Sequence, residues 1–298
     1  MKNIKAFLMT AVCALVLSAC GTTSTVPITG RKHSLLVDDQ TILSLSTQQY
    51  NEVLSKSTLS KDANKTAMVK RVGQKLANAV ETFLRNNGMA AEVNNFAWEF
   101  NLVQDNQVNA FCMPGGKIVV YEGLLPVTQN EPSLAIVLGH EIAHAVAKHS
   151  AEQMSKQIRQ QYGTQILGGI LGSAVGSGIG NAAQAIASAG FSFANLKYSR
   201  DNETEADHMG LIFAAMAGYD PREAIPFWQR MSQGSTNQDD LFSDHPSDEK
   251  RIAHLQKVMP EALQYYRPAN TTITQPATTT KKASGKTYKF TTKKATKK

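Results

Sequence analysis

The feature that most constrains this chain is a pair of histidines, His140 and His144, with Glu141 directly after the first. Two imidazoles four residues apart share one face only on a helix, where together they can bind one zinc ion. An apolar stripe supports that helix: Leu134, Val137, Leu138, Ile142 and Val146. Glu141 can take a proton from a metal-bound water, so the motif predicts a zinc-dependent protease. The alternative is two ordinary histidines on an amphipathic helix.

The segment from Glu203 to Asp207 offers a third metal ligand. A catalytic zinc uses three protein ligands and leaves one position for water. On a helix Glu203 and Asp207 share a face, whereas Glu205 points to the opposite side. We therefore expect Glu203 to complete a site for one Zn²⁺ per chain, and Asp207 to accept the other ring N–H of His140. A solvated acidic helix face is the alternative.

The order HExxH followed by ExxAD resembles the gluzincin zinc metallopeptidases, in particular the family of the type I CAAX prenyl protease and HtpX, in its soluble periplasmic lipoprotein branch (BepA- and LoiP-like). Three further segments are similar to that branch: residues 26–31, 109–116 and 244–246. The resemblance implies zinc on His140, His144 and Glu203, with Glu141 as the base. It also implies an α+β fold, a mostly helical zincin-like domain with a small β-sheet beside the active-site helix.

The resemblance implies a role for His245 at the metal. In the BepA-like members, a histidine followed by proline can reach the metal as a fourth ligand and hold the enzyme latent. The residues alone are equally compatible with a loop-capping histidine before Pro246. His245 and Arg200 are also the two candidates for stabilising the transition state, and Arg200 could equally be a structural ion-pair partner.

A β-hairpin is expected just before the metal-binding helix. Residues 96–103 alternate as a strand, and a Pro-Gly-Gly turn at 114–116 separates two further strands. In zincins an edge strand beside the active helix pairs with the substrate backbone, which recognises extended chains without demanding a sequence. The residues expected in that role are Ala110, Phe111, Cys112 and Met113. An ordinary internal hairpin is the alternative.

The first 19 residues have the pattern of a bacterial lipoprotein signal peptide. Lys2 and Lys5 precede an apolar run too short to span a bilayer. Residues 17–20 resemble a lipobox, which implies lipidation of Cys20 and an anchor in the outer membrane facing the periplasm. Residues 20–46 would then be a tether and N-terminal extension. A plain secreted protein cut elsewhere is the alternative.

One catalytic domain, residues 47–267, is expected from its length, and the location of the charge argues against nucleic-acid binding. The formal charge of +7 comes from the tail, since residues 269–298 hold eight lysines and no acid. The Lys/Thr-rich tail, residues 268–298, is expected to be disordered and either to contact anionic lipid or only to solubilise the protein. Cys112 alone remains after removal of the signal and lipidation of Cys20, so no internal disulfide is expected.

Residues 160–196 lack any charge and contain glycines at every fourth position from Gly168 to Gly180. One membrane span there would separate His144 from Glu203 across the bilayer, so a span is rejected. We expect instead a helical hairpin close to the zinc cleft, serving either as a lid or as an inert packing element. Four other histidines are expected at the surface or in capping positions: His33, His149, His208 and His254.

These features predict a lipid-anchored zinc endopeptidase. Its partners would be unfolded or misassembled envelope proteins, degraded as quality control. The rival prediction is a chaperone-like assembly factor that binds unfolded outer-membrane proteins and cuts rarely.

Overall fold

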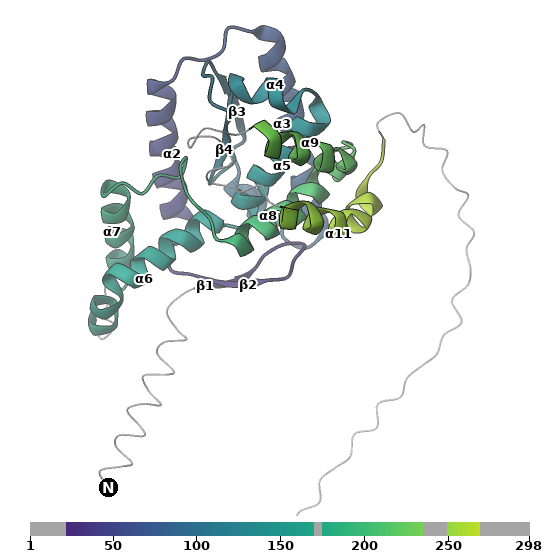
Figure 1. Ribbon diagram of the computed structural model, residues 1–298. Helices are drawn as coiled ribbons and strands as arrows, with labels where there is room; N and C mark the ends of the chain where they lie inside the picture. Colours follow the sequence, from purple (N-terminus) through teal and green to yellow (C-terminus); the bar gives the residue numbers. More distant parts are fainter. Residues whose placement is uncertain (1–21, 170–174, 235–248, 269–298) are drawn as a thin grey trace, which may run out of the picture. The chain divides into compact units, whose positions relative to one another are not determined.

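The structure is a computed structural model that describes residues 22–169, 175–234 and 249–268 (Figure 1). Predictions for the signal segment, Cys20, His245 and residues 269–298 lie outside these ranges. The strands are β1 (Thr22–Thr25), β2 (Lys32–Leu35), β3 (Glu99–Val103), β4 (Ala110–Met113) and β5 (Lys117–Tyr121). The helices are α2 (Asp39–Lys56), α3 (Ala63–Asn86), α4 (Leu125–Thr128), α5 (Glu131–Val146), α6 (His149–Gly169), α7 (Val175–Ser188), α8 (Arg200–Met216), α9 (Ala224–Gly234) and α11 (Glu249–Tyr265). The α+β prediction, mostly helical with small sheets, is confirmed.

The main sheet has the strand order β3-β5-β4. β4 and β5 form the expected hairpin, joined through Gly115 and Gly116 at positive φ, where a Cβ on Gly116 would lie 2.4 Å from the Trp98 ring. β3 pairs in parallel with β5. It begins at Glu99 rather than at residue 96, because Phe96 still donates its N–H to Val93 and ends a 3₁₀ turn. β4 is therefore an edge strand, and it packs against α5.

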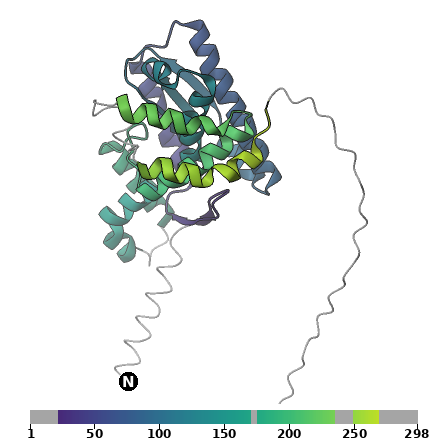
Figure 2. The ribbon, with the colours of Figure 1, turned by 45° about the vertical axis from the view of Figure 1, so that its right-hand side comes forward.

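Helix α5 lies at the centre of the core. Asn130 caps its first turn by accepting the Ser133 N–H at 2.8 Å, and Pro132 occupies the first turn, where no N–H is needed. Every residue from Ser133 to Val146 is buried, so the helix is enclosed on all sides rather than along one stripe. It packs against α3, α8 and the sheet (Figures 1 and 2). A helix this buried holds its polar side chains in one orientation, as a metal site requires.

The charge-free segment forms most of a pair of packed helices, α6 and α7. The pair begins at His149, earlier than expected, and α7 packs on α6 and α2. Ala183 and Ile186 of α7 are buried in a second apolar cluster that includes Ile42 of α2 and Phe111 of β4. Among the described residues, no helix combines the length and hydropathy of a membrane span.

Residues 22–35, expected to belong to a tether, form a two-stranded antiparallel hairpin, β1–β2. Its turn is held by hydrogen bonds from Gly30 N to Val26 O at 3.0 Å and from Val26 N to Arg31 O at 2.8 Å. Ile28 and Gly30 both have positive φ, 66° and 70°. Val26 is 1% exposed in the main core cluster. The hairpin is thus packed onto the α-helical body through its turn.

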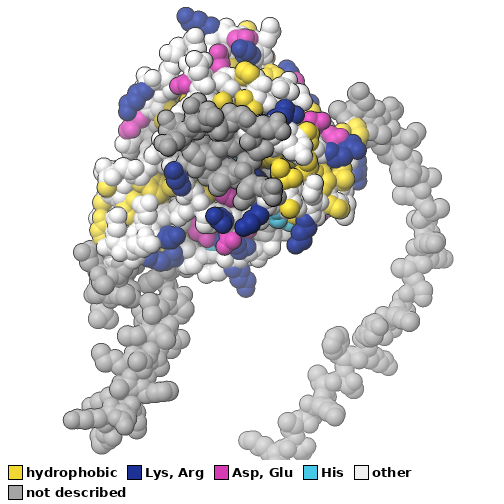
Figure 3. Space-filling view, viewed as in Figure 1, with side chains coloured by type: hydrophobic (Ala, Val, Ile, Leu, Met, Phe, Trp, Pro, Cys, Tyr) yellow, Lys and Arg dark blue, Asp and Glu magenta, His cyan; other side chains and the backbone are white. Residues whose placement is uncertain are grey.

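Charged side chains of both signs are mixed over the described surface. Figure 3 shows Lys and Arg side chains interspersed with Asp and Glu on one face. Lys148, for example, pairs with Asp39 at 2.8 Å and Glu92 at 2.9 Å. Lys148 has a positive φ of 56° between α5 and α6, so these ion pairs stabilise a strained link between the two helices.

Candidate active site

Helices α5 and α8 bring His140, His144 and Glu203 together, with one ligand atom of each within 4.8 Å of the others. The two Nε2 atoms are 3.1 Å apart, and each Nε2 is 3.4 Å from an oxygen of Glu203. All three residues are buried. Tetrahedral ligands about 2.0–2.2 Å from a zinc ion are about 3.3–3.6 Å apart. The donor types and their spacing therefore fit a zinc ion.

This convergence depends on two glycines where α5 crosses α8. A Cβ on Gly210 would lie 2.6 Å from the His140 nitrogen, and a Cβ on Gly139 would lie 2.7 Å from the Gly210 oxygen. The two backbones are thus in direct contact beside the first histidine. Glu203 and Asp207 lie two turns and one turn before Gly210 and are carried against α5 by the same contact.

The second ring nitrogen of His140 faces Asp207, whose Oδ1 is 2.9 Å from Nδ1. Asp207 also accepts from Arg251 of α11 at 2.6 Å, and the Arg251 guanidinium lies 3.5 Å over the Trp228 ring. Burial lowers the pKa of His140, but hydrogen bonds to Asp207 and Glu203 outweigh it and raise the value to about 9 in the metal-free protein. For Asp207 burial raises the pKa, and Arg251 and His140 bring it below its usual range.

Arg251 had no signal in the sequence, because it lies 111 residues beyond His140 and in no motif. Arg200, a predicted candidate for transition-state stabilisation, is the exposed first residue of α8. It lines a surface hollow together with Glu203, Asp207 and Arg251.

Glu141 is 3% exposed and lies beside the edge strand. It lines a small cavity with Ala110, Phe111 and Cys112 of β4 on one side and residues 193–198 on the other. Met113 completes the strand, and all four strand residues are buried. Burial, with a smaller effect from Glu141, raises the pKa of the Cys112 thiol well above its usual range, so this cysteine stays protonated.

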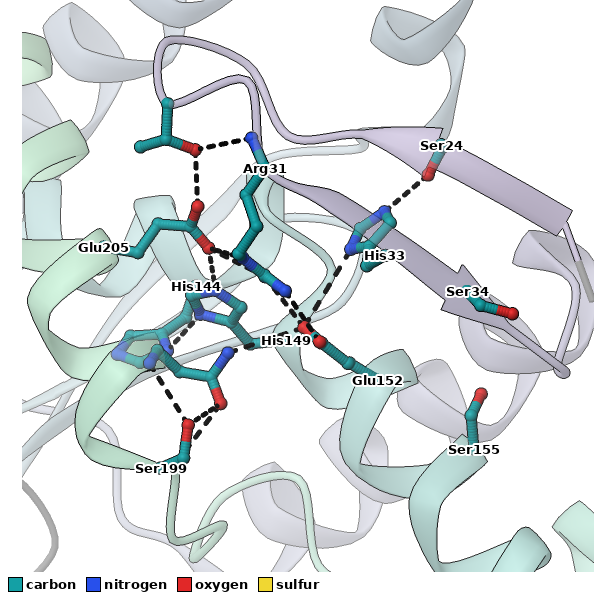
Figure 4. Close-up of polar contacts among 12 residues, drawn as sticks. Ser24, Arg31, His33, Ser34, His144, His149, Glu152, Ser155, Ser199 and Glu205 are labelled. Carbon is teal, nitrogen blue, oxygen red and sulfur yellow. Dashed lines mark hydrogen bonds and ion pairs between the residues drawn. The ribbon is translucent and has the colours of Figure 1, made fainter.

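His149 lies against His144, which corrects the prediction that it is a surface or capping residue. Its ring is fully buried, with Nδ1 2.9 Å from Nδ1 of His144 and Nε2 3.0 Å from Glu205 (Figure 4). The helix break at Lys148 turns the chain so that the first residue of α6 contacts the preceding helix. Tyr198 stacks on the ring of His144, at 4.0 Å between ring centroids, and its ring is 5.8 Å from that of His149.

The remaining histidines differ in their surroundings. His33 was also expected at the surface, but it is 6% exposed and contacts Ser24 across the β1–β2 hairpin. His208 is partly exposed and lies 2.8 Å from Glu261, and His254 is partly buried.

Residues 63–259 match peptidase family M48. The mitochondrial metalloendopeptidase OMA1 of Arabidopsis thaliana is 39% identical over 174 residues, which cover 57% of this chain and 34% of that protein. Human OMA1 is 30% identical over 251 residues, 82% of this chain and 47% of the relative. The beta-barrel assembly-enhancing protease of Yersinia pestis is 31% identical over 161 residues, 52% and 33% respectively.

The chain thus spans between a third and a half of the length of these curated relatives. The family match includes all of the residues that converge at the cluster, from α5 to α8. The resemblance drawn from the two motifs is confirmed, and this chain belongs to peptidase family M48.

Proposed function

We propose that this protein is a zinc-dependent endopeptidase. The observation that carries the proposal is the buried cluster of two imidazoles and one carboxylate: the two Nε2 atoms are 3.1 Å apart, and each is 3.4 Å from one of the two Glu203 oxygens. His140, His144 and Glu203 would hold the ion and leave a fourth position open. When bound there, zinc would polarise the scissile carbonyl and lower the pKa of a water molecule.

Glu141 is the proposed general base. It directly follows His140 on α5 and lines the cavity beside β4. Its carboxylate would take a proton from the attacking water and return it to the leaving amine. Burial of the surrounding side chains excludes bulk water, which strengthens each charge interaction in the site.

Extended or unfolded polypeptide is the proposed substrate. The edge position of β4 beside α5 supports pairing of a substrate backbone with Ala110, Phe111, Cys112 and Met113. All four residues are buried, and the first three share a cavity with the segment 193–198. That segment would therefore have to move before a chain could pair with the strand. We infer that cleavage is conditional on this movement.

The proposed location is the bacterial envelope. The signal pattern and Cys20 support a lipid anchor in the outer membrane facing the periplasm. One group of relatives is named for enhancing beta-barrel assembly, and another is mitochondrial. We propose that unfolded or misassembled envelope proteins are degraded here.

The buried state of β4 also favours the second candidate, an assembly factor that binds such proteins and cuts rarely.

Metal removal separates the two candidates. Full-length protein should digest unfolded casein, lose this activity on chelation and regain it when one equivalent of zinc is added back. Digestion is followed by the appearance of amino groups, and metal content is measured on the same samples. Bound casein that remains intact in the zinc-loaded protein would favour the assembly factor. Activity that survives complete metal removal would contradict both the requirement for zinc and the role of Glu141 as the base for a metal-bound water.

His245 is proposed to hold a latent state as a fourth metal ligand, on the strength of the family resemblance. Its replacement by alanine should then raise the rate of casein digestion at equal zinc content, because no histidine would compete with water for the fourth coordination position of the metal. The matched control is His208→Ala, since His208 pairs with Glu261 and is not among the clustered residues. Equal rates in wild type, His245→Ala and His208→Ala would contradict the latent state.

A further inference from the structure

A continuous hydrogen-bonded network connects His144 with the N-terminal hairpin. Nδ1 of His144 contacts Nδ1 of His149 at 2.9 Å, and Nε2 of His149 lies 3.0 Å from Oε2 of Glu205. Arg31 donates from Nε to the same oxygen at 2.8 Å. Figure 4 shows the Arg31 side chain reaching from the hairpin between Glu205 on α8 and Glu152 on α6.

The direction of each hydrogen bond in this network follows from the carboxylate at its end. Glu205, ionised beside Arg31, can only accept, so Nε2 of His149 carries a hydrogen and donates it. With that hydrogen on Nε2, Nδ1 of His149 can accept the N–H of His144 Nδ1, which lies 2.9 Å away. This leaves the lone pair of His144 on Nε2, the atom that faces His140 and Glu203. The network thus selects the tautomer of His144 that can bind a metal.

The hairpin turn holds the charged end of the network in place. The Arg31 guanidinium bonds both oxygens of Glu152, at 2.7 and 2.9 Å, and also pairs with Glu205 at 2.7 Å. Thr29 donates its hydroxyl to the other oxygen of Glu205. The positive φ values on either side of Thr29, together with buried Val26, fix the turn against the body. Glu205 is 7% exposed, so its charge is screened little by solvent.

The two histidine ligands are supported by equivalent arrangements. On one side Asp207 contacts His140 directly and is paired with Arg251. On the other side Glu205 acts through the ring of His149 and is paired with Arg31. Each ligand therefore has an arginine–carboxylate pair behind its second nitrogen, although one arginine comes from α11 and the other from the chain's described amino-terminal end.

We propose that His149, Glu205 and Arg31 are positioning residues that fix the tautomer and ring orientation of His144, so that the β1–β2 hairpin forms part of the metal centre. The inference rests on the proposed zinc site and adds residues to it. Partners behind a metal ligand typically change metal affinity by about 10- to 100-fold when they are removed.

Zinc affinity of the full-length protein tests the proposal, measured by competition with a chromophoric chelator. His149→Phe, which keeps a buried ring without nitrogen atoms, should raise the zinc Kd by about 10- to 100-fold. Arg31→Met and Glu205→Gln should weaken binding less, and Arg31→Lys should recover part of the loss. The matched control is Arg71→Met, because Arg71 forms a comparable arginine–glutamate pair with Glu131 outside the network.

Cobalt substitution provides a second readout, which would not change if these residues had only a structural role. The visible absorption bands of the Co²⁺ form should change in His149→Phe and Arg31→Met and stay unchanged in Arg71→Met. If His149→Phe does not fold, the Arg31→Met variant tests the proposal instead, because the Arg31 side chain is about one-third exposed. Wild-type Kd and spectra in all network variants would overturn the proposal and leave the zinc site standing. Wild-type protein that binds no zinc would overturn the proposed function itself.

Discussion

Replacing Glu141 with glutamine should lower the rate of casein cleavage by about 10²- to 10⁴-fold, the usual contribution of a positioned general base. Glutamine has nearly the same shape, so it fits the buried cavity beside β4, but it cannot take a proton from water. Since Glu141 is not among the three clustered ligand residues, the zinc Kd should stay within about threefold of wild type. Initial rates and zinc content measured on the same preparation check both statements.

A matched control for this variant is Glu52→Gln, because Glu52 is exposed on α2, away from the cluster. That protein should cleave casein at the wild-type rate. Undiminished cleavage by Glu141→Gln at full zinc content would remove Glu141 from the mechanism. Loss of zinc from Glu141→Gln would show instead that this side chain helps to hold the metal, and the loss of activity would then say nothing about proton transfer.

The parts of the site that lie close together in sequence could be predicted. The i, i+4 spacing of His140 and His144 defines a helix face without any knowledge of the rest of the fold. The Pro-Gly-Gly turn predicts the β4–β5 hairpin for a similarly local reason. Glu203 was assigned through a general rule on zinc ligands and through the second motif, and one of its carboxylate oxygens lies within 4.8 Å of a ring nitrogen of each histidine.

The supporting residues could not be predicted, because they depend on contacts between distant segments. His149 is five residues after His144, and only the left-handed conformation of Lys148 turns it back onto that ring. Arg31 and Arg251 come from opposite ends of the described chain, 174 residues before Glu205 and 44 after Asp207 respectively. Neither spacing has a period that a sequence pattern could reveal. From the sequence alone, a carboxylate on the far side of a helix, such as Glu205, is expected to be solvated, because the contact with the β1–β2 hairpin is not evident.

Substituting alanine for Gly210 should have the largest effect on the fold among single methyl additions at the site. The new Cβ would lie 2.6–2.8 Å from backbone atoms of Gly139 and His140, and backbone cannot move aside as a side chain can. The helices would have to separate, which we expect to lower the free energy of unfolding by about 1–3 kcal/mol or more. Because α8 carries Glu203, the same separation should raise the zinc Kd. Chemical denaturation and chelator competition measure the two effects.

Gly180→Ala is the control that isolates this crowding from the ordinary consequences of replacing a helical glycine. Gly180 lies in α7, and a Cβ there would meet no atom within 4 Å. Alanine should therefore stabilise that helix slightly, by up to about 1 kcal/mol, and leave zinc binding unchanged. The same helix propensity favours alanine at position 210, so any loss of stability there measures the contact with α5. Wild-type stability and zinc affinity in Gly210→Ala would mean that the crossing of α5 and α8 tolerates a wider separation, and that the spacing of the three ligands is set elsewhere.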